Sequence, residues 1–554
     1  MRISFAQDEI ISDVVKNISF DIPSAKITAL IGESGSGKSV TALSFLKLLP
    51  DASSISGEML FSEDGTNAEN LLLLSREKMR ELRGNKIAMI FQEPMTSLNP
   101  VHTCGAQVME ALMVHKKISK AAAKDAAIEL FKKVELPVPR QMINRYPHEI
   151  SGGQKQRVMI AMAMSCDPAF LIADEPTTAL DVRVQKNILL LLKKLQAENG
   201  MGILLITHDL SLVADVADEI AVMYKGELVE TGKANIVLTQ PQHLYTKALL
   251  ACKPSGEKKG KKLSIVADVL NGNNIDEKVL LNSTSSSSTQ TVLKVENLHV
   301  KFAAAKNMFG RVTEYFNAVD DVSFTVNKNE TVGLVGESGC GKTTLGRAIL
   351  GLIKPAAGNI IFNDKNIASY NEREMRVVRK ELQIVFQDPY GSLNPRLSIG
   401  DAIVEPIKVH YPHINKNTRK EKAIHLLEEV NMGADSFNRY PHQFSGGQRQ
   451  RICIARALAL EPNFLIFDES VSALDVSVQA QVLNLINDLK ARYNFTSIFI
   501  SHDLSVIHYI SDRVMVMHNG KIIEQNTADE IFYHPKENYT KELLNAVSGI
   551  KFAL

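Results

Sequence analysis

The stretch GESGSGKS occupies Gly32–Ser39 and returns as GESGCGKT at Gly336–Thr343. A GxxxxGK[ST] loop between a strand and a helix binds phosphates, because its backbone N–H groups converge on the anion. We therefore expect the lysines to reach the β- and γ-phosphates of ATP and the hydroxyl side chains to bind Mg²⁺. The residues assigned to the two loops are Gly32, Ser34, Gly35, Gly37, Lys38, Ser39, Gly336, Ser338, Gly339, Gly341, Lys342 and Thr343.

Three further motifs recur in the same order behind each loop. Their spacing is nearly the same in both halves of the 554-residue chain, which indicates two copies of one domain. The pairs are FQEPMTSLNP (Phe91–Pro100) with FQDPYGSLNP (Phe386–Pro395), SGGQKQR (Ser151–Arg157) with SGGQRQR (Ser445–Arg451), and THDLS (Thr207–Ser211) with SHDLS (Ser501–Ser505).

Composition marks the seam between the copies. Residues 252–291 are rich in Lys, Gly, Asn and Ser, so we expect a flexible linker between a first domain at 1–251 and a second at 292–554. A coil of about 40 residues spans roughly 35 Å and holds the domains at an effective concentration of order mM. The two domains are therefore expected to pair within one chain.

Each copy alternates short apolar runs with helical patterns. Ile27–Ile31, Phe170–Ala173 and Ile203–Ile206 are expected to be buried strands, and Val40–Leu49 a helix. This order predicts an α/β fold with a largely parallel sheet. Helical subdomains are expected at Gly105–Leu136 and Ile399–Gly433.

Two carboxylates end one apolar strand in each copy, as FLIADE at Phe170–Glu175 and as FLIFDE at Phe464–Glu469. Strand ends are where α/β sheets place ligands. We expect the aspartates, Asp174 and Asp468, to bind Mg²⁺ and the glutamates, Glu175 and Glu469, to polarise the attacking water.

The SGGQ segments could be plain helix N-caps, because serine is a preferred capping residue. Between two sets of P-loop motifs they also resemble the signature of ATP-binding cassettes, whose serine and glycines donate to a phosphate. That resemblance implies nucleotide contacts for Ser151, Gly152, Gly153, Gln154, Ser445, Gly446, Gly447 and Gln448.

The cassette resemblance also assigns roles to residues that spacing alone would not single out. It implies that His208 and His502 sense the γ-phosphate, that Gln92 and Gln387 couple Mg²⁺ and water to a transporter, and that Asp181 and Asp475 lie in the D-loops. A ring that stacks on adenine has a candidate in the second half, at Phe316 or Tyr315. The first half has Ile11 and Ser12 there.

Within this class the chain resembles the fused ATP-binding subunits of peptide-type ABC importers, the dipeptide, oligopeptide and nickel group. The short motifs that support this resemblance are SLNP, RYPH before each signature, and QHLYTKALL at Gln242–Leu250. The resemblance implies tandem P-loop domains, each with an antiparallel β subdomain, that close head to tail on two ATPs. It implies two transmembrane permease subunits, indirectly a substrate-binding protein, and a peripheral position on the cytoplasmic face of the inner membrane. It does not name the solute.

Other functions fit less well. A cassette-class translation factor acting on the ribosome also joins two such domains, but through a long charged helix that this Ser- and Gly-rich linker does not favour. The net charge of +1 gives no reason to expect a nucleic-acid partner. The five cysteines form no CxxC pair, which argues against a zinc-bearing DNA-repair ATPase.

Overall fold

The computed structural model describes residues 1–7, 10–63, 65–92, 97–177, 180–272, 290–306, 312–472 and 474–545. It divides into two compact units, Met1–Leu250 with Val269–Asn271 and Ala251–Asp268 with Gly272–Leu554. Among the described residues, each unit contains a six-stranded mixed sheet, a separate antiparallel sheet and a helical subdomain. The predicted α/β fold is confirmed.

The central sheet of the first unit has the strand order β11-β10-β3-β9-β8-β7, and only β10 and β11 pair antiparallel. Its strand β8 is buried throughout, because the sheet is covered on both faces. Phe170 and Ile172 join the core beneath the antiparallel sheet, and Leu171 and Ala173 join the core beneath the helices. The strand bounds are β3 Ile27–Ile31, β7 Ile87–Ile90, β8 Phe170–Asp174, β9 Gly202–Ile206, β10 Glu219–Tyr224 and β11 Glu227–Lys233.

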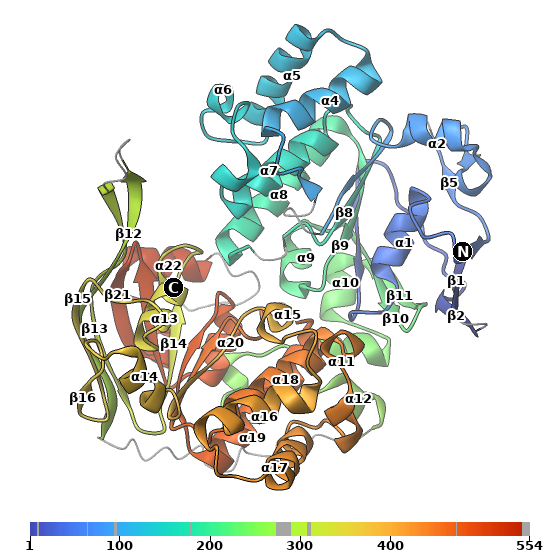
Figure 1. Ribbon diagram of the computed structural model, residues 1–554. Helices are drawn as coiled ribbons and strands as arrows, with labels where there is room; N and C mark the ends of the chain where they lie inside the picture. Colours follow the sequence, from blue (N-terminus) through green and yellow to red (C-terminus); the bar gives the residue numbers. More distant parts are fainter. Residues whose placement is uncertain are drawn as a thin grey trace. The chain divides into compact units, whose positions relative to one another are not determined.

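The remaining elements of the first unit lie around this sheet. Strands β1 and β2 stand on one side of β8 and β9, and helices α4 to α6 stand on another (Figure 1). The small strands are β1 Arg2–Gln7, β2 Ile10–Val15, β4 Ser53–Ser56, β5 Leu60–Phe61 and β6 Glu69–Asn70. The helices are α1 Lys38–Phe45, α2 Arg76–Leu82, α4 Cys104–Lys116, α5 Lys120–Lys133, α6 Pro139–Met142, α7 Gly152–Ala163, α8 Val182–Asn199, α9 Leu210–Val216, α10 Ala234–Thr239 and α11 Leu244–Ala251.

The second unit repeats this plan with the order β17-β18-β19-β14-β20-β21 in its central sheet. Its strands are β12 Thr291–Lys306, β13 Val312–Asn327, β14 Thr331–Val335, β15 Ala357–Phe362, β16 Lys365–Asn366, β17 Leu382–Val385, β18 Phe464–Asp468, β19 Thr496–Ile500, β20 Arg513–His518 and β21 Lys521–Thr527. Its helices are α13 Lys342–Ile349, α14 Glu372–Val378, α15 Pro389–Ser392, α16 Ile399–His410, α17 Lys416–Glu429, α18 Gly446–Leu458, α19 Val476–Tyr493, α20 Leu504–Ile510, α21 Ala528–Tyr533 and α22 Asn538–Asn545. In the described parts of both units, no helix is long and apolar enough to cross a membrane.

Residues 252–268, which we call the strap, differ from the sequence expectation. They were expected to be flexible linker, but they belong to the second unit. The side-chain amide of Asn484 on α19 bonds both the N–H and the C=O of Leu263, at 2.9 and 2.8 Å. Tyr509 on α20 donates to the carbonyl of Lys261 at 2.8 Å. Side chains of the second unit thus bond the backbone of the strap at Lys261 and Leu263, and the Leu263 side chain is buried. Helix α12 spans Val266–Leu270, and residues 273–289 of the predicted linker lie outside the described residues.

Candidate active sites

Each glycine-rich loop joins a buried central strand to a helix, β3 to α1 in the first unit and β14 to α13 in the second. A Cβ atom at Gly32 would lie 2.1 Å from the carbonyl oxygen of Met223, and one at Gly336 would lie 2.2 Å from that of Met517. Glycine is therefore required where each loop passes the neighbouring strand. Gly37 takes a φ of 101° as the N-cap of α1, a conformation that favours glycine.

The two P-loop lysines are buried inside their loops. Lys38 Nζ donates to the carbonyl oxygens of Gly32 and Glu33 at 2.8 and 2.7 Å. Lys342 repeats this arrangement with the equivalent carbonyls, at 2.7 and 2.9 Å. The ammonium groups are thus held at defined points of the loops. A fixed cation at the N-terminus of a helix is suited to binding phosphate.

Two of the three predicted magnesium ligands, the hydroxyl and the aspartate, meet in each unit, and the glutamine contacts the neighbouring glutamate. Ser39 Oγ donates to Asp174 Oδ1 at 3.2 Å, and Thr343 Oγ1 donates to Asp468 Oδ1 at 3.0 Å. Burial raises the pKa of Asp174 to about 6, with the nearby charge of Glu175 acting in the same direction. Burial also raises the pKa of Asp468. A carboxylate that is costly to keep charged in the bare protein is one that a bound cation would stabilise.

The predicted catalytic glutamates are held from two sides. Gln92 Nε2 donates to Glu175 Oε2 at 2.8 Å, and Nδ1 of His208 lies 3.2 Å from Glu175 Oε1. In the second unit Gln387 Nε2 donates to Glu469 at 2.7 Å. His502 Nδ1 lies 3.4 Å from the same carboxylate. The structure thus brings together glutamate, glutamine and histidine, three of the residue types that the sequence singled out, in both copies.

Electrostatics link each glutamate to its histidine. Burial alone would lower the pKa of His208, but the hydrogen bond and charge of Glu175 outweigh it, so this pKa is raised. Burial alone would raise the pKa of Glu469, but His502 outweighs it, so this pKa is lowered. The glutamates also carry positive φ angles, 46° for Glu175 and 48° for Glu469. Such angles are uncommon for residues other than glycine and often occur at functional sites.

The signature segments form helix N-termini, as their capping interpretation predicted. Ser151 Oγ accepts from the Gln154 N–H at 3.4 Å, and Gln154 Oε1 accepts from the Ser151 N–H at 3.1 Å, a complete capping box. The equivalent serine, Ser445, caps α18 in the same way.

The two signature glycines of the second unit have different surroundings. A Cβ at Gly447 would lie 2.2 Å from Val478 Cγ1, so packing against α19 explains that glycine. A Cβ at Gly446 would meet no heavy atom of the described residues within 4 Å. Packing within the unit therefore does not explain this glycine. Close approach by a ligand would explain it.

Two other predictions concern residues at the edges of the sites. Asp181 and Asp475 cap α8 and α19, each accepting from the backbone N–H three residues on, at 3.0 Å. Phe316 and Tyr315 are exposed on β13, as a surface that stacks on a base requires, and Ile11 is exposed on β2. Their contacts with nucleotide stay predictions. Residues 93–96, within the quoted FQEPMTSLNP motif, and residues 178–179 and 473, which precede Asp181 and Asp475, lie outside the described residues.

Sequence reasoning missed one pair of site residues. Tyr245 on α11 accepts a hydrogen bond from the backbone N–H of Glu33, at 3.1 Å. Tyr539 on α22 accepts the same bond from Glu337, also at 3.1 Å. Both tyrosines precede Thr-Lys, and this short repeat is the signal that could have identified them.

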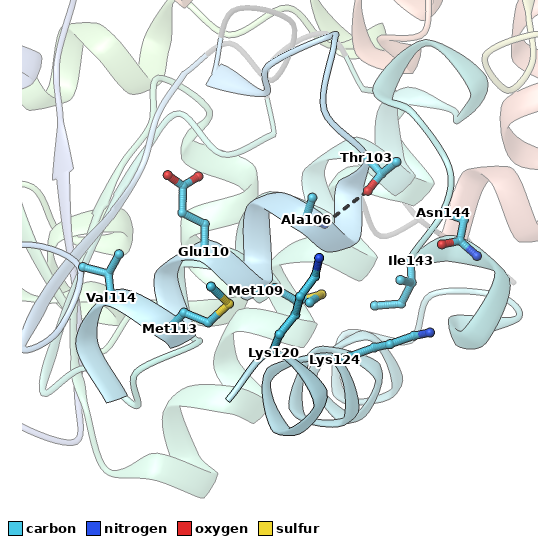
Figure 2. Close-up of a pocket in the computed structure, with 10 residues that line it drawn as sticks. All are labelled: Thr103, Ala106, Met109, Glu110, Met113, Val114, Lys120, Lys124, Ile143 and Asn144. Carbon is cyan, nitrogen blue, oxygen red and sulfur yellow. Dashed lines mark hydrogen bonds between the residues drawn. The ribbon is translucent and has the colours of Figure 1, made fainter. Parts of the chain in front are cut away.

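The helical subdomain of the first unit has a pocket of about 600 Å³. Figure 2 shows Met109, Met113 and Val114 along α4, with Lys120 and Lys124 on the adjacent α5. Met113 and Val114 are large apolar side chains that remain exposed. The pocket thus combines apolar side chains with two lysines and one acidic residue, Glu110.

Comparisons with known proteins agree with this geometry. The family model described as ABC transporter matches residues 15–178 and 319–472. A second, described as Oligopeptide/dipeptide transporter, C-terminal region, matches residues 229–273. The chain is 46% identical over 553 residues to the peptidoglycan transport ATP-binding protein YejF of Agrobacterium fabrum, covering 100% of this chain and 96% of that protein. It is 45% identical over 557 residues to the glutathione import ATP-binding protein GsiA of Escherichia coli K12, covering 99% and 88%.

Among solved structures, the chain is similar to the dimeric ATP-binding cassette MJ0796 bound to ADP and Pi. It is 25% identical, covers 43% of this chain and 98% of its own, and has a TM-score of 0.39. The family is shown by the sequence matches, which extend over both units. The chain therefore belongs to the ABC transporter family of ATPases, in the group that carries the oligopeptide/dipeptide transporter C-terminal region.

Proposed function

We propose that this chain hydrolyses ATP to power the import of short peptides or peptide-containing solutes through separate permease subunits. The observation that carries the proposal is a cluster of side chains that occurs in both units. In each, an aspartate bonds the hydroxyl of the P-loop, and the glutamate next to it in sequence accepts a hydrogen bond from a glutamine. The import direction and solute class are supported by the oligopeptide/dipeptide C-terminal region and by relatives named for import. That region also favours an importer over a ribosomal factor.

The residues at each site fit Mg²⁺, because a buried carboxylate lies within hydrogen-bond distance of a hydroxyl. Among the described residues no three His, Cys, Asp or Glu side chains form a metal cage. Ser39, Gln92 and Asp174, or Thr343, Gln387 and Asp468, would therefore share the ion with the nucleotide and water. When bound, Mg²⁺ supplies positive charge against the phosphate oxygens.

The side chains then have separate tasks. The Lys38 ammonium holds the β- and γ-phosphates. The Glu175 carboxylate orients a water and takes its proton as the water oxygen bonds to the γ-phosphorus. The bond from that phosphorus to the bridging oxygen breaks, leaving ADP and phosphate. His208 and Gln92 keep the carboxylate aimed, and Glu469 performs the same step in the second unit.

We infer that each site is completed by the other unit. Two observations support this inference. The space beside Gly446 is open, and the helix N-terminus at Ser445 is exposed, so both could contact the phosphates of an ATP bound to the other unit. In a head-to-tail pair, Ser445 would meet ATP held by Lys38, and Ser151 would meet ATP held by Lys342. Closing on ATP and opening after hydrolysis would then move the permeases.

The inferred partners are two permease subunits on the cytoplasmic face of the inner membrane, supplied with solute by a substrate-binding protein. The pocket on α4 and α5 suits a short amphipathic permease helix. Its apolar side would cover Met113 and Val114, and an acidic residue would pair with Lys120 or Lys124 (Figure 2).

Glu175→Gln and Glu469→Gln test the chemistry. Each keeps the size of the side chain but removes its ability to take a proton, so steady-state ATPase activity should fall by roughly two orders of magnitude or more. Glu129→Gln, on the exposed face of α5, is the matched control and should leave the rate unchanged. If either catalytic variant kept most of the activity, the proposed base would be wrong for that site.

Affinity purification from detergent-solubilised membranes tests the partners. Two hydrophobic permease chains should co-purify, and the proteoliposome complex should import a labelled peptide only with ATP. Recovery of ribosomal proteins instead, with most of the chain in the soluble fraction, would overturn the import proposal and leave the ATPase assignment standing.

A further inference from the structure

The phosphate loops are contacted by the helices at the C-terminal end of each ATPase fold. Tyr245 comes from α11, some two hundred residues after the loop, and its hydroxyl oxygen accepts from the Glu33 N–H at 3.1 Å. Tyr539 of α22 makes the same bond to Glu337 at 3.1 Å. The contact thus occurs twice, in two units whose surrounding sequences differ.

Ring packing fixes where each hydroxyl lies. The Tyr245 ring is fully buried and stacks on Tyr224 of β10, with centroids 4.1 Å apart. The Tyr539 ring packs on His518 of β20, with centroids 4.0 Å apart. A phenol held in this way has little rotational freedom to lose. Its oxygen is a preformed acceptor for the loop.

The bonded residue is also the one that positions the catalytic lysine. The Glu33 N–H donates to Tyr245, and the Glu33 carbonyl accepts from Lys38 Nζ at 2.7 Å. In the second unit Glu337 stands in the same way between Tyr539 and Lys342, with a carbonyl distance of 2.9 Å. Tyrosine and lysine therefore restrain the two ends of one residue.

The opposite side of each loop has a different support. The Gly226 N–H, in the β10–β11 turn, donates to the Ser36 carbonyl at 3.2 Å, and the Gly520 N–H donates to the Cys340 carbonyl at 3.0 Å. These bonds hold the distal half of the loop. In the half that begins at Gly32, Lys38 bonds the carbonyls of Gly32 and Glu33, and the tyrosine bonds the Glu33 N–H. Removing the hydroxyl should therefore release the Glu33 end and leave the rest in place.

We propose that Tyr245 and Tyr539 are positioning residues that hold the phosphate loops, and through them Lys38 and Lys342, in the geometry that binds ATP. This rests on the proposed ATP sites and deepens them. Tyr245 lies within the region matched by the oligopeptide/dipeptide C-terminal model, residues 229–273. That region is therefore part of the nucleotide site of the first unit.

The effect should appear in ATP affinity. Without the hydroxyl the Glu33 N–H loses the acceptor that holds this end of the loop, so the loop can leave the geometry that binds ATP. ATP binding must then restore that geometry at a cost in free energy. Tyr245→Phe keeps the ring stack and should weaken ATP binding roughly tenfold. The KM for ATP should rise by a similar factor while kcat holds, because the glutamate and histidine are unchanged.

The experiment measures Mg²⁺-dependent binding of a fluorescent ATP analogue to the full chain carrying Lys342→Ala, so that only the first site reports. Tyr245→Phe in that background should raise Kd roughly tenfold. Tyr224→Phe removes a hydroxyl from the stacked neighbour, leaves the Glu33 bond intact, and should keep Kd within about twofold. Tyr539→Phe with Lys38→Ala repeats the measurement in the second site if the first variant fails to fold.

Each outcome is decisive. An unchanged Kd in both tyrosine variants would overturn the inference, as would an equal loss in Tyr224→Phe, which would indicate general packing. A lower melting temperature with normal Kd and KM would show a purely structural role and would also overturn it. Failure of the Lys342→Ala parent to bind ATP would refute the proposed function itself, which distinguishes the two ideas.

Discussion

Replacing Asp174 with asparagine should stabilise the nucleotide-free protein while destroying its magnesium site. Burial raises the pKa of Asp174 to about 6, from a reference of 3.8, so the folded protein pays to keep this carboxylate ionised at neutral pH. A shift of about two units corresponds to about 3 kcal/mol. This is an upper limit, because the amide must also be desolvated. Asparagine keeps an oxygen to accept from Ser39.

The pH dependence gives this prediction its sign. Above pH 6 the cost is fully present, and it fades as the pH falls towards 3.8, where the folded and unfolded states are both protonated. At pH 5 roughly half of the gain should remain. For a unit of this size, about 3 kcal/mol moves the melting temperature by roughly 6–12 °C. The assay is calorimetry of the nucleotide-free protein at pH 8, 7 and 5.

Two controls complete the experiment. Asp125→Asn on the exposed face of α5 should change nothing, and Asp468→Asn should stabilise the second unit, because burial raises that pKa too. Added MgATP should stabilise the wild type by about 2.7 kcal/mol at a hundred times Kd, and Asp174→Asn by much less. An equal or lower melting temperature for Asp174→Asn at pH 7, or a gain that does not shrink at pH 5, would refute the charge-burial argument.

Three further outcomes are expected. Gly447→Ala should lower the melting temperature of the second unit, because its Cβ would meet Val478 at 2.2 Å, whereas Gly446→Ala should melt normally but lose ATPase activity. Equal melting losses in both would contradict this. Met113→Glu should keep the ATPase rate of the isolated chain and lose permease binding in pull-downs, and unchanged pull-down would rule out the α4 pocket. Alkylation of the Cys340 thiol should be slow at pH 7 and faster at higher pH, because burial raises the pKa of this thiol. Mass spectrometry measures the alkylation rate, and a rate that does not change with pH would contradict the prediction.

Much of each site could be predicted from sequence because its residues lie in short, repeated motifs. Strands β3 and β8 could be predicted because each is a short apolar run followed directly by residues of the nucleotide site. The structure has both strands where they were expected. The predicted helix at Val40–Leu49 begins two residues earlier, at Lys38, because Gly37 itself provides the N-cap. Boundaries set by cap geometry are poorly encoded in hydrophobic patterns.

The tyrosine contact could not be predicted, because the two partners are far apart in the chain. Tyr245 and Glu33 meet only once the sheet has brought α11 beside the loop. The strap was mispredicted for a different reason. Its Lys- and Gly-rich composition looks solvated, but its polar backbone is satisfied by Asn484 and Tyr509, which are distant in sequence. Composition records what a segment contains and carries no information on the surface it meets.

The strap has a practical consequence for dividing the chain. A fragment that starts at residue 292, where the repeat begins, would lack the strap. Asn484 and Tyr509 would lose the backbone groups that they bind, and the surface against which Leu263 packs would be exposed. A fragment that starts at Ala251 would keep the strap and these contacts. The strap lies within the region matched by the oligopeptide/dipeptide model at 229–273. The segment that follows the first sequence repeat is thus part of the second folded unit. A synthetic peptide of residues 252–268 should bind a fragment that starts at residue 292 and restore these contacts.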